Sequence, residues 1–410
     1  MKNIFYALLF FTLPCFAQTK ILFDASKAQM CSNADWVIDA DQHNIGTSGN
    51  GSMYVGGSGN ESNPQRYPTP AQSGITQSTA ETYWDGALSA WAVDLVKLGY
   101  EVESLPYNGT ITYGNSNNAQ DLSHYKVFIS DEPNILFSSS EKTALIQFVQ
   151  HGGGLFMIAD HAGSDRNFDG FDSPQIWNDL MNNNTVQIHP FGMEFDSANF
   201  SQTSSNIATL PNDSCLHNSA VGNVTQIKIS GGTSITLNHA DNSSAKGLIF
   251  KTGASTTGTT QVLLASARYG NGKVAALTDS SPPDDGTGDP NDNLYFSYTG
   301  EANGSHRIFL LNTTIWLAAT SSDTVSTGVE EFQISNSTFQ IFPNPTTGML
   351  NVEVSNELIG EEISLLDFTG RKILSAVVST GNQKLETGNL NAGIYFLKMK
   401  NETRKFIKLD

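Results

Sequence analysis

The chain has 410 residues, 40 acidic and 22 basic, with a formal net charge of −18 at pH 7, and its length allows two or three domains. So acidic a surface repels nucleic acid and anionic membranes, and it suits divalent cations or plain solubility in a salty medium. After residue 17 no stretch approaches the roughly 20 apolar residues of a membrane helix, so we expect no transmembrane segment.

The first residues, MKNIFYALLFFTLPCFAQ, have the three parts of a secretory signal peptide. Lys2 supplies the positive charge, Ile4 to Leu13 form the apolar core, and Cys15-Phe16-Ala17 is a small-x-small cleavage site. We therefore predict a signal peptide over residues 1–17 and an exported mature chain. Cys31 and Cys215 then remain, either as one disulfide or as two separate thiols.

Residues 18–319 alternate between strand and helix patterns. The run from Lys20 to Phe23 predicts a first strand, and apolar residues at helical spacing predict a helix over Thr79 to Leu98. Thr185 to Thr260 is rich in Ser, Thr, Asn and Gly and is typical of short strands and loops. The other predicted elements are strands over Tyr100 to Leu105, Lys126 to Ser130, Leu155 to Ala159, Val262 to Tyr269 and Lys273 to Thr278, and helices over Ser138 to Gly152, from Ser173 onward and over Ser305 to Ala318.

This order predicts an α/β domain with a flavodoxin-like, mostly parallel sheet and flanking helices. The predicted strands end in acidic residues at four places: Asp24, Asp131-Glu132, Asp160-His161 and Asp279. In parallel sheets, ligands bind beyond the carboxyl ends of the strands. We therefore predict a polar site where these strand ends meet.

The passage SSEKTALIQFVQHGGGLFMIADH resembles the class I glutamine amidotransferase-like fold, in particular its trehalose-utilisation-type domains. There a helix ends in Gly-Gly-Gly before the strand that leads to the elbow. The resemblance covers roughly residues 20 to 318 and implies an α/β fold. True amidotransferases place a Cys nucleophile in a Gly-rich elbow, with a later His–Glu pair. This sequence has no such Cys, and His161 lies near the elbow position, so we do not expect glutamine hydrolysis.

Residues 339–410 resemble the type A C-terminal sorting domain of the Bacteroidetes type IX secretion system. The matching pieces are FQIFPNPTTGMLNVEV, LLDFTGRKIL and LNAGIYFLKMKNETRKFIKLD. Alternating apolar residues over Leu350 to Val354 and Ile394 to Lys400 independently predict a small β-sandwich, preceded by a Ser/Thr-rich linker over residues 320–338. The resemblance implies the type IX secretion machinery as a partner, and a secreted or cell-surface location.

Asp160 and His161 directly follow a buried strand. A carboxylate beside an imidazole can bind a transition metal or act as an acid–base partner. A histidine that only caps the sheet edge is the plainer alternative. With Asp279 at the end of another strand, we predict Asp160, His161 and Asp279 as catalytic residues.

The pattern Asp165-x-Asn167-x-Asp169-Gly170 matches the first half of a calcium loop. The twelfth position, where a complete EF-hand has Glu, is Ile176, so Asp172 or another residue would have to complete the site. A divalent cation such as calcium, held by Asp165, Asn167, Asp169 and Asp172, and a plain Asx-turn loop both remain open.

Three further residues are candidates for binding a substrate: Arg66, Arg166 and Trp36. An Arg in an acidic site could bind a carboxylate or sulfate, or pair with a neighbouring Asp. Trp36 could stack on a sugar. No GxSxG, HExxH, Walker or dinucleotide motif is present, which argues against a standard serine hydrolase, zinc protease or nucleotide enzyme.

Two functions are consistent with this sequence. The first is a secreted, metal-assisted hydrolase acting on an extracellular substrate, with a glycan as the candidate. The second is a non-catalytic, calcium-stabilised binding or adhesion protein. An enzyme needs an open position in a concave pocket, whereas a structural calcium is enclosed by protein oxygens.

Overall fold

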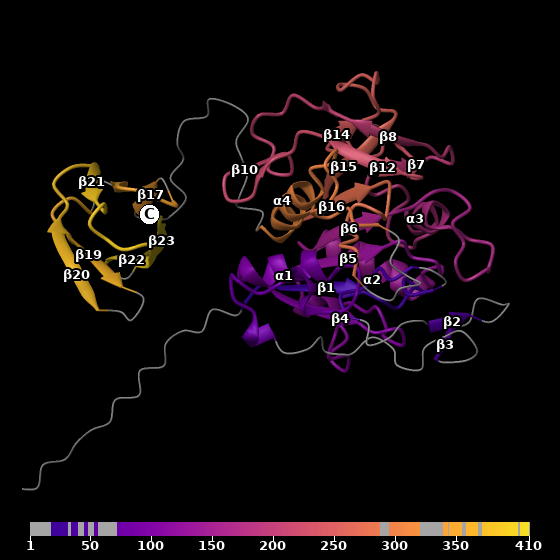
Figure 1. The fold of residues 1–410 in the computed structure, drawn as a ribbon, viewed down its shortest axis with the longest axis horizontal. Coiled ribbons are helices and arrows are strands. Elements are labelled where there is room, and N and C mark those ends of the chain that lie inside the picture. Colours follow the sequence, from indigo (N-terminus) through magenta and orange to yellow (C-terminus); the bar gives the residue numbers. More distant parts are fainter. Residues whose placement is uncertain are drawn as a thin grey trace, which may run out of the picture. The chain divides into compact units, whose positions relative to one another are not determined.

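The computed structural model describes residues 18–31, 34–39, 45–47, 53–55, 72–287, 295–319, 339–342, 344–354, 358–367, 371–400 and 402–409. The chain divides into two compact units, one ending at Val325 and the other beginning at Ser326 (Figure 1). The predicted signal peptide, the predicted linker and Arg66 lie outside the described residues. In the described part of the chain, no helix has the length and apolar character needed to cross a membrane.

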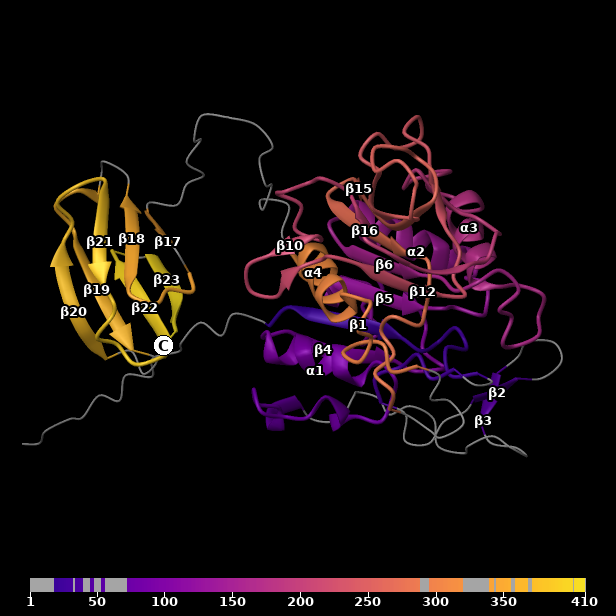
Figure 2. The ribbon, with the colours of Figure 1, turned by 45° about the horizontal axis from the view of Figure 1, so that its top comes forward.

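Parallel strands form one half of the sheet in the first unit (Figures 1 and 2). Its ten described strands are ordered β4-β1-β5-β6-β16-β15-β13-β7, with β14 paired with β15 and β9 paired with β14. Neighbours are parallel from β4 to β16. These five strands are β1 (Lys20–Asp24), β4 (Glu101–Leu105), β5 (Val127–Asp131), β6 (Gly154–Ile158) and β16 (Gly272–Leu277).

Antiparallel strands extend the sheet beyond β16. A tight hairpin around Gly270-Asn271 joins β15 to β16. The extension contains β15 (Val262–Tyr269), β13 (Ile235–Leu237), β7 (Met193–Phe195), β14 (Lys246–Phe250) and β9 (Asn206–Ile207). The predicted α/β sheet is therefore confirmed, and it is a mixed one.

Short paired strands complete this unit: β2 (Ile45–Thr47) with β3 (Met53–Val55), β8 (Ser201–Ser204) with β12 (Ile227–Ser230), and β10 (His217–Asn218) with β11 (Gly222–Asn223). Single 3-10 turns span Gln72–Gly74, Glu81–Tyr83 and Leu122–His124. Most of these short strands and turns lie in the Ser/Asn/Gly-rich segments of the sequence.

Helices cover both faces of the sheet. The crossovers β1-α1-β4 and β5-α2-β6 run in opposite directions along the strand order, so right-handed connections place α1 (Ser89–Lys97) and α2 (Ser139–Gln150) on opposite faces. The last helix of the unit, α4 (His306–Ala318), packs against α1. Helix α3 (Ser173–Asn182) follows β6 and contacts β7.

The α-helix predicted over Thr79 to Leu98 is shorter than expected: α1 begins at Ser89, and the residues before it contain only the 3-10 turn at Glu81–Tyr83. The backbone N–H groups of Gly86 and Leu88 donate to the carbonyls of Ile38 and Val37, so this stretch pairs with a loop instead. A Cβ on Gly86 would lie 2.2 Å from the Val37 oxygen, which explains the glycine at this close approach.

The core of the first unit is formed by its strands and the inner faces of its helices. Trp84 and Trp91 are buried in it. Cys31 and Cys215 belong to different buried clusters and form no disulfide, so the alternative of two separate thiols holds.

The second unit is the predicted β-sandwich. Its two sheets are ordered β17-β18-β21 and β20-β19-β22-β23, and both contribute side chains to one core. The strands are β17 (Phe339–Phe342), β18 (Met349–Val354), β19 (Glu362–Asp367), β20 (Lys372–Val377), β21 (Asn382–Glu386), β22 (Gly393–Met399) and β23 (Glu402–Lys408).

Candidate functional site

The acidic strand ends meet at one edge of the parallel half of the sheet. Asp131 pairs with Ile158, and Ile158 pairs with Leu277. Asp160 and Asp279 each follow a paired residue by two positions, so they leave neighbouring strands at the same level. Both carboxyl groups are buried, at 4% and 0% exposure. The register of the sheet thus brings together residues that are distant in the sequence.

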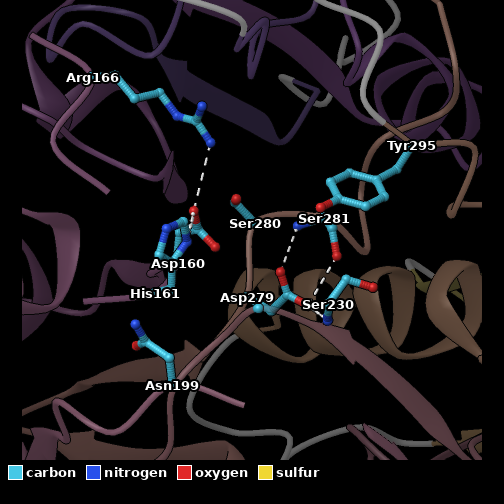
Figure 3. Close-up of a pocket in the computed structure, with 10 residues that line it drawn as sticks. Asp160, His161, Arg166, Asn199, Ser230, Asp279, Ser280, Ser281 and Tyr295 are labelled. Carbon is cyan, nitrogen blue, oxygen red and sulfur yellow. Dashed lines mark hydrogen bonds and ion pairs between the residues drawn. The ribbon is translucent and has the colours of Figure 1, made fainter. Parts of the chain in front are cut away.

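A cavity of about 350 Å³ opens at this edge (Figure 3). It combines charged groups with hydroxyl and amide groups. Its lining residues are Asp160, His161, Arg166, Asn199, Ser230, Gly231, Asp279, Ser280, Ser281 and Tyr295. All three residues predicted as catalytic, and one of the predicted substrate-binding residues, therefore lie around one pocket.

His161 is held by Asp160. Its Nδ1–H donates to Oδ2 of Asp160 at 2.8 Å, and this hydrogen bond is the main reason why the pKa of His161 is raised above its ordinary value. The His161 side chain is 42% exposed, whereas that of Asp160 is 6% exposed. Within the described part of the chain, no hydrogen bond involves Nε2 of His161. The ring is therefore anchored on one side and available on the other.

The loop after β6 is fixed by side chains from two other segments. The backbone N–H of Asp160 donates to the Ser173 hydroxyl, at the first turn of α3. Asn199 exchanges two hydrogen bonds of 2.8 Å with the backbone of Ala162. Both contacts hold the backbone around His161 and so define where its ring lies.

Arg166 pairs with acidic neighbours, which was the alternative to binding a substrate anion. Its Nε donates to Oε1 of Glu132 at 2.6 Å and its Nη2 donates to Oε2 at 3.2 Å. The same Nη2 lies 3.5 Å from Oδ2 of Asp160. The positive charge of Arg166 is thus shared between two carboxylates.

Glu132 is the buried hub of the site, with 0% exposure. Besides Arg166, it accepts hydrogen bonds from the hydroxyls of Ser164 (2.6 Å) and Ser280 (2.8 Å). Trp36 also donates its indole N–H to Glu132. Trp36 is 1% exposed, so the prediction that it stacks on a sugar is wrong: it supports Glu132 from the interior.

Asp279 faces the pocket from the end of β16. It accepts hydrogen bonds from the backbone N–H groups of Ser230 and Ser281 and from the Ser281 hydroxyl. Burial, and then the charge of Asp160, raise its pKa to about 7. The turn carrying Ser230 packs tightly on the strand end, because a Cβ on Gly232 would lie 2.3 Å from the Thr278 oxygen.

Further buried carboxyl groups surround the pocket. Asp131 has no hydrogen-bond partner for either oxygen among the described residues, and burial followed by repulsion from Glu132 raises its pKa well above the ordinary value. Burial also raises the pKa of Asp284 to about 7 and that of Asp285 to about 6. Asp285 accepts the N–H of Ala90 in the first turn of α1.

The predicted calcium loop is closed by hydrogen bonds of its own. Asp165 accepts the N–H groups of Asp169 and Gly170, and Asn167 donates to Asp169. Asp172 caps α3 by accepting the N–H of Gln175. Across the described ranges, no group of three or more His, Cys, Asp or Glu side chains is arranged to hold a metal ion. Among the described residues, the Asn167 side-chain oxygen is buried without a hydrogen-bond partner, so both the Asx-turn loop and the cation site stay predictions.

Sequence reasoning gave no role to Glu132, Asn199 or Ser230. Glu132 had one signal, its place beside Asp131 at a strand end. Its partners Ser164, Arg166 and Ser280 come from separate loops, and their convergence requires the fold.

The first unit has structural relatives of low identity. A cytoplasmic protein of Salmonella typhimurium is 13% identical, with a TM-score of 0.35, over 73% of this chain and 97% of its own. A second cytoplasmic protein of that organism is 13% identical, with a TM-score of 0.33, over 57% and 87%. A ThuA-like protein of Parabacteroides merdae is 10% identical, with a TM-score of 0.36, over 74% and 90%. None of these similarities extends to a function.

Among curated proteins, none matches the chain significantly. Residues 340–409 match the family described as the secretion system C-terminal sorting domain. The resemblance found in the tail sequence is therefore confirmed, and it implies an interaction with the secretion machinery. The protein is one that is secreted or displayed at the cell surface, and residues 340–409 are its sorting domain.

Proposed function

We propose that the first unit is an extracellular hydrolase that acts on a small, hydroxyl-rich substrate such as a carbohydrate. The observation that carries the proposal is the presence of His161 and Asp279 on one pocket, each with a pKa moved toward or beyond neutrality. General acid–base catalysis is most effective when the pKa values of the two groups lie near the working pH.

The two groups divide the proton transfers. Asp279, whose pKa is raised to about 7, takes a proton from water in its ionised form as the water oxygen bonds to the electrophilic carbon of the substrate. His161, whose raised pKa favours the imidazolium, gives its Nε2 proton to the leaving oxygen as the bond to that oxygen breaks. Asp160 accepts the hydrogen bond from Nδ1 of His161 and stabilises the charged ring.

The pocket suits a neutral, polar substrate. The positive charge of Arg166 is taken up by Glu132 and Asp160, so it adds little attraction for an anion. The remaining lining residues offer hydroxyl and amide groups, which match sugar hydroxyls: Asn199, Ser230, Ser280, Ser281 and Tyr295. The cavity volume of about 350 Å³ lies within the range of small-molecule sites.

The proposed steps do not require a divalent cation. Because Asp165, Asn167, Asp169 and Asp172 are engaged in hydrogen bonds or helix capping, the proposed steps do not pass through a metal. We expect hydrolysis by the purified protein to persist in excess EDTA. Loss of activity in EDTA, with recovery on adding calcium, would return the cation to the mechanism.

The test is a hydrolysis screen on glycans and esters, with His161→Ala and Asp279→Asn beside the wild type. We expect each substitution to lower kcat by about 100-fold or more, because it removes one proton-transfer group. The matched control is His151→Ala, which removes an exposed histidine at the end of α2, away from the pocket. Equal rates for wild type and His161→Ala would exclude His161 from the mechanism. Absence of hydrolysis throughout, with tight glycan binding, would favour the non-catalytic binding protein.

A further inference from the structure

We propose that Glu132 is a positioning residue for His161, acting through Arg166 and Asp160. The inference deepens the proposed function and rests on the role of His161 in it. Glu132 does not line the pocket, and nothing in the sequence pattern gives it this role. It is set apart by its place at the start of a continuous chain of charged groups that ends at the His161 ring.

The four side chains in this series alternate in charge. Oε1 of Glu132 is 2.6 Å from Nε of Arg166, Nη2 of Arg166 is 3.5 Å from Oδ2 of Asp160, and that same oxygen accepts Nδ1–H of His161 at 2.8 Å. Figure 3 shows Arg166 reaching down to Asp160, which lies against the His161 ring. Arg166 and Asp160 therefore each lie between two groups of opposite sign.

Several contacts hold the Glu132 side chain in one position. Its carboxylate is fully buried and accepts hydrogen bonds from Ser164 and Ser280 as well as from Arg166. Its backbone has a φ of +42°, a left-handed conformation that is unfavourable for a residue with a Cβ. Strained backbone of this kind persists where the surrounding contacts over-determine it, and it gathers at functional sites.

These charges determine the direction in which the pKa of His161 changes when the charge of Glu132 is removed. The negative charge of Glu132 raises the pKa of His161, and the positive charge of Arg166 lowers it. Without the Glu132 charge, Arg166 would act on Asp160 alone and compete with His161 for Oδ2. Both consequences lower the pKa of His161. The other titratable groups that line the pocket are Asp279 and Tyr295.

The experiment is an NMR titration of the His161 ring in the full-length protein without substrate. We expect the pKa of His161 to fall on the order of half a unit or more in Glu132→Gln, and further in Asp160→Asn, which removes the direct partner. Glu132→Asp keeps the charge, so we expect its titration to stay closer to that of the wild type.

The matched control is Glu141→Gln. Glu141 is also a buried carboxylate with a basic partner, Lys27 at 2.8 Å, but it lies at the start of α2. We expect it to leave the His161 titration unchanged. An identical titration in wild type and natively folded Glu132→Gln would overturn the proposal.

A measurement on the unmodified protein covers the case in which Glu132→Gln does not fold. The chain of charges holds the Nδ1–H tautomer when His161 is neutral, and ¹⁵N chemical shifts distinguish the two tautomers. A neutral ring with its proton on Nε2 would also overturn the proposal. Because neither readout needs turnover, each can succeed even if the hydrolysis screen fails.

Activity supplies a separate readout once a substrate is found. His161 is the proposed acid, so the alkaline limb of the kcat profile reports the loss of its proton. We expect this limb to move to lower pH in Glu132→Gln, by the same shift that NMR measures. An unmoved alkaline limb, together with a shifted NMR titration, would contradict the assigned role of His161 and leave the role of Glu132 intact.

Discussion

At the scale of single residues, the unusual feature is the number of carboxyl groups buried beside one another. Asp131 is the extreme case, since it is 1% exposed and neither oxygen has a hydrogen-bond partner among the described residues. Burying a polar group without a partner is costly, and burying its charged form more so. The group is therefore held in its neutral form, and the cost should be measurable.

We expect Asp131→Asn to stabilise the protein, and to do so more at pH 8 than at pH 5. The pKa of Asp131 is raised in the folded state, so its contribution is most favourable below the unfolded pKa and is lost as the pH rises through the folded pKa. Asparagine resembles the neutral form of the acid but does not ionise, so its contribution to stability does not fall as the pH rises. We expect a gain of about 1–3 kcal/mol at pH 8.

Urea unfolding followed by tryptophan fluorescence measures this gain in the first unit, because all five tryptophans of the chain precede residue 320. An equal gain at the two pH values would show that ionisation of Asp131 plays no part. A loss of stability at both would show that the Asp131 carboxyl makes a favourable contact.

Single residues were predictable from the sequence where the pattern of the chain placed them. Asp160, His161 and Asp279 follow strands, so the rule for parallel sheets puts them at one edge. Trp36 was not predictable in this way, because nothing in an irregular loop distinguishes a buried indole from an exposed one. The pairing of Arg166 with Glu132 depends on two loops meeting, and spacing cannot report that.

At the scale of elements, Lys273 connects β16 to the end of α4. It is 2% exposed, and its Nζ donates to the carbonyls of Trp316 (2.7 Å) and Ala319 (2.8 Å). Carbonyls at a helix C-terminus have no partner within the helix, and a cation there is favourable. The lysine thus ties the last helix to the sheet.

We expect Lys273→Met to lower the free energy of unfolding by about 1–3 kcal/mol, because it leaves buried carbonyls unsatisfied. The same fluorescence-detected urea unfolding measures it. Lys97→Met, in the last turn of α1, is the control and should change stability by less than about 0.5 kcal/mol. Similar effects for the two substitutions would mean that the Lys273 hydrogen bonds contribute little.

Elements with strong local patterns were predictable, and those defined by distant contacts were not. The helix predicted from Ser138 and the two strands β15 and β16 formed as expected. The antiparallel extension was not foreseen, since its strands between Met193 and Phe250 are short and pair with segments far along the chain.

At the scale of the whole molecule, the two units have separate cores. The second matches a sorting domain, so we expect removal of residues 339–410 to prevent the protein from reaching the medium or the cell surface. Cell fractionation and immunoblotting measure this. Full-length His161→Ala is the control and should be exported like the wild type. Normal export of the truncated chain would show that the signal lies elsewhere.

Whether the pocket beside His161 is catalytic is decided by the hydrolysis screen, run side by side on wild type and His161→Ala. We expect at least one glycan or ester that the wild type cleaves and that His161→Ala cleaves about 100-fold more slowly or worse. Equal cleavage by both proteins, or cleavage of no substrate by the wild type, would contradict it.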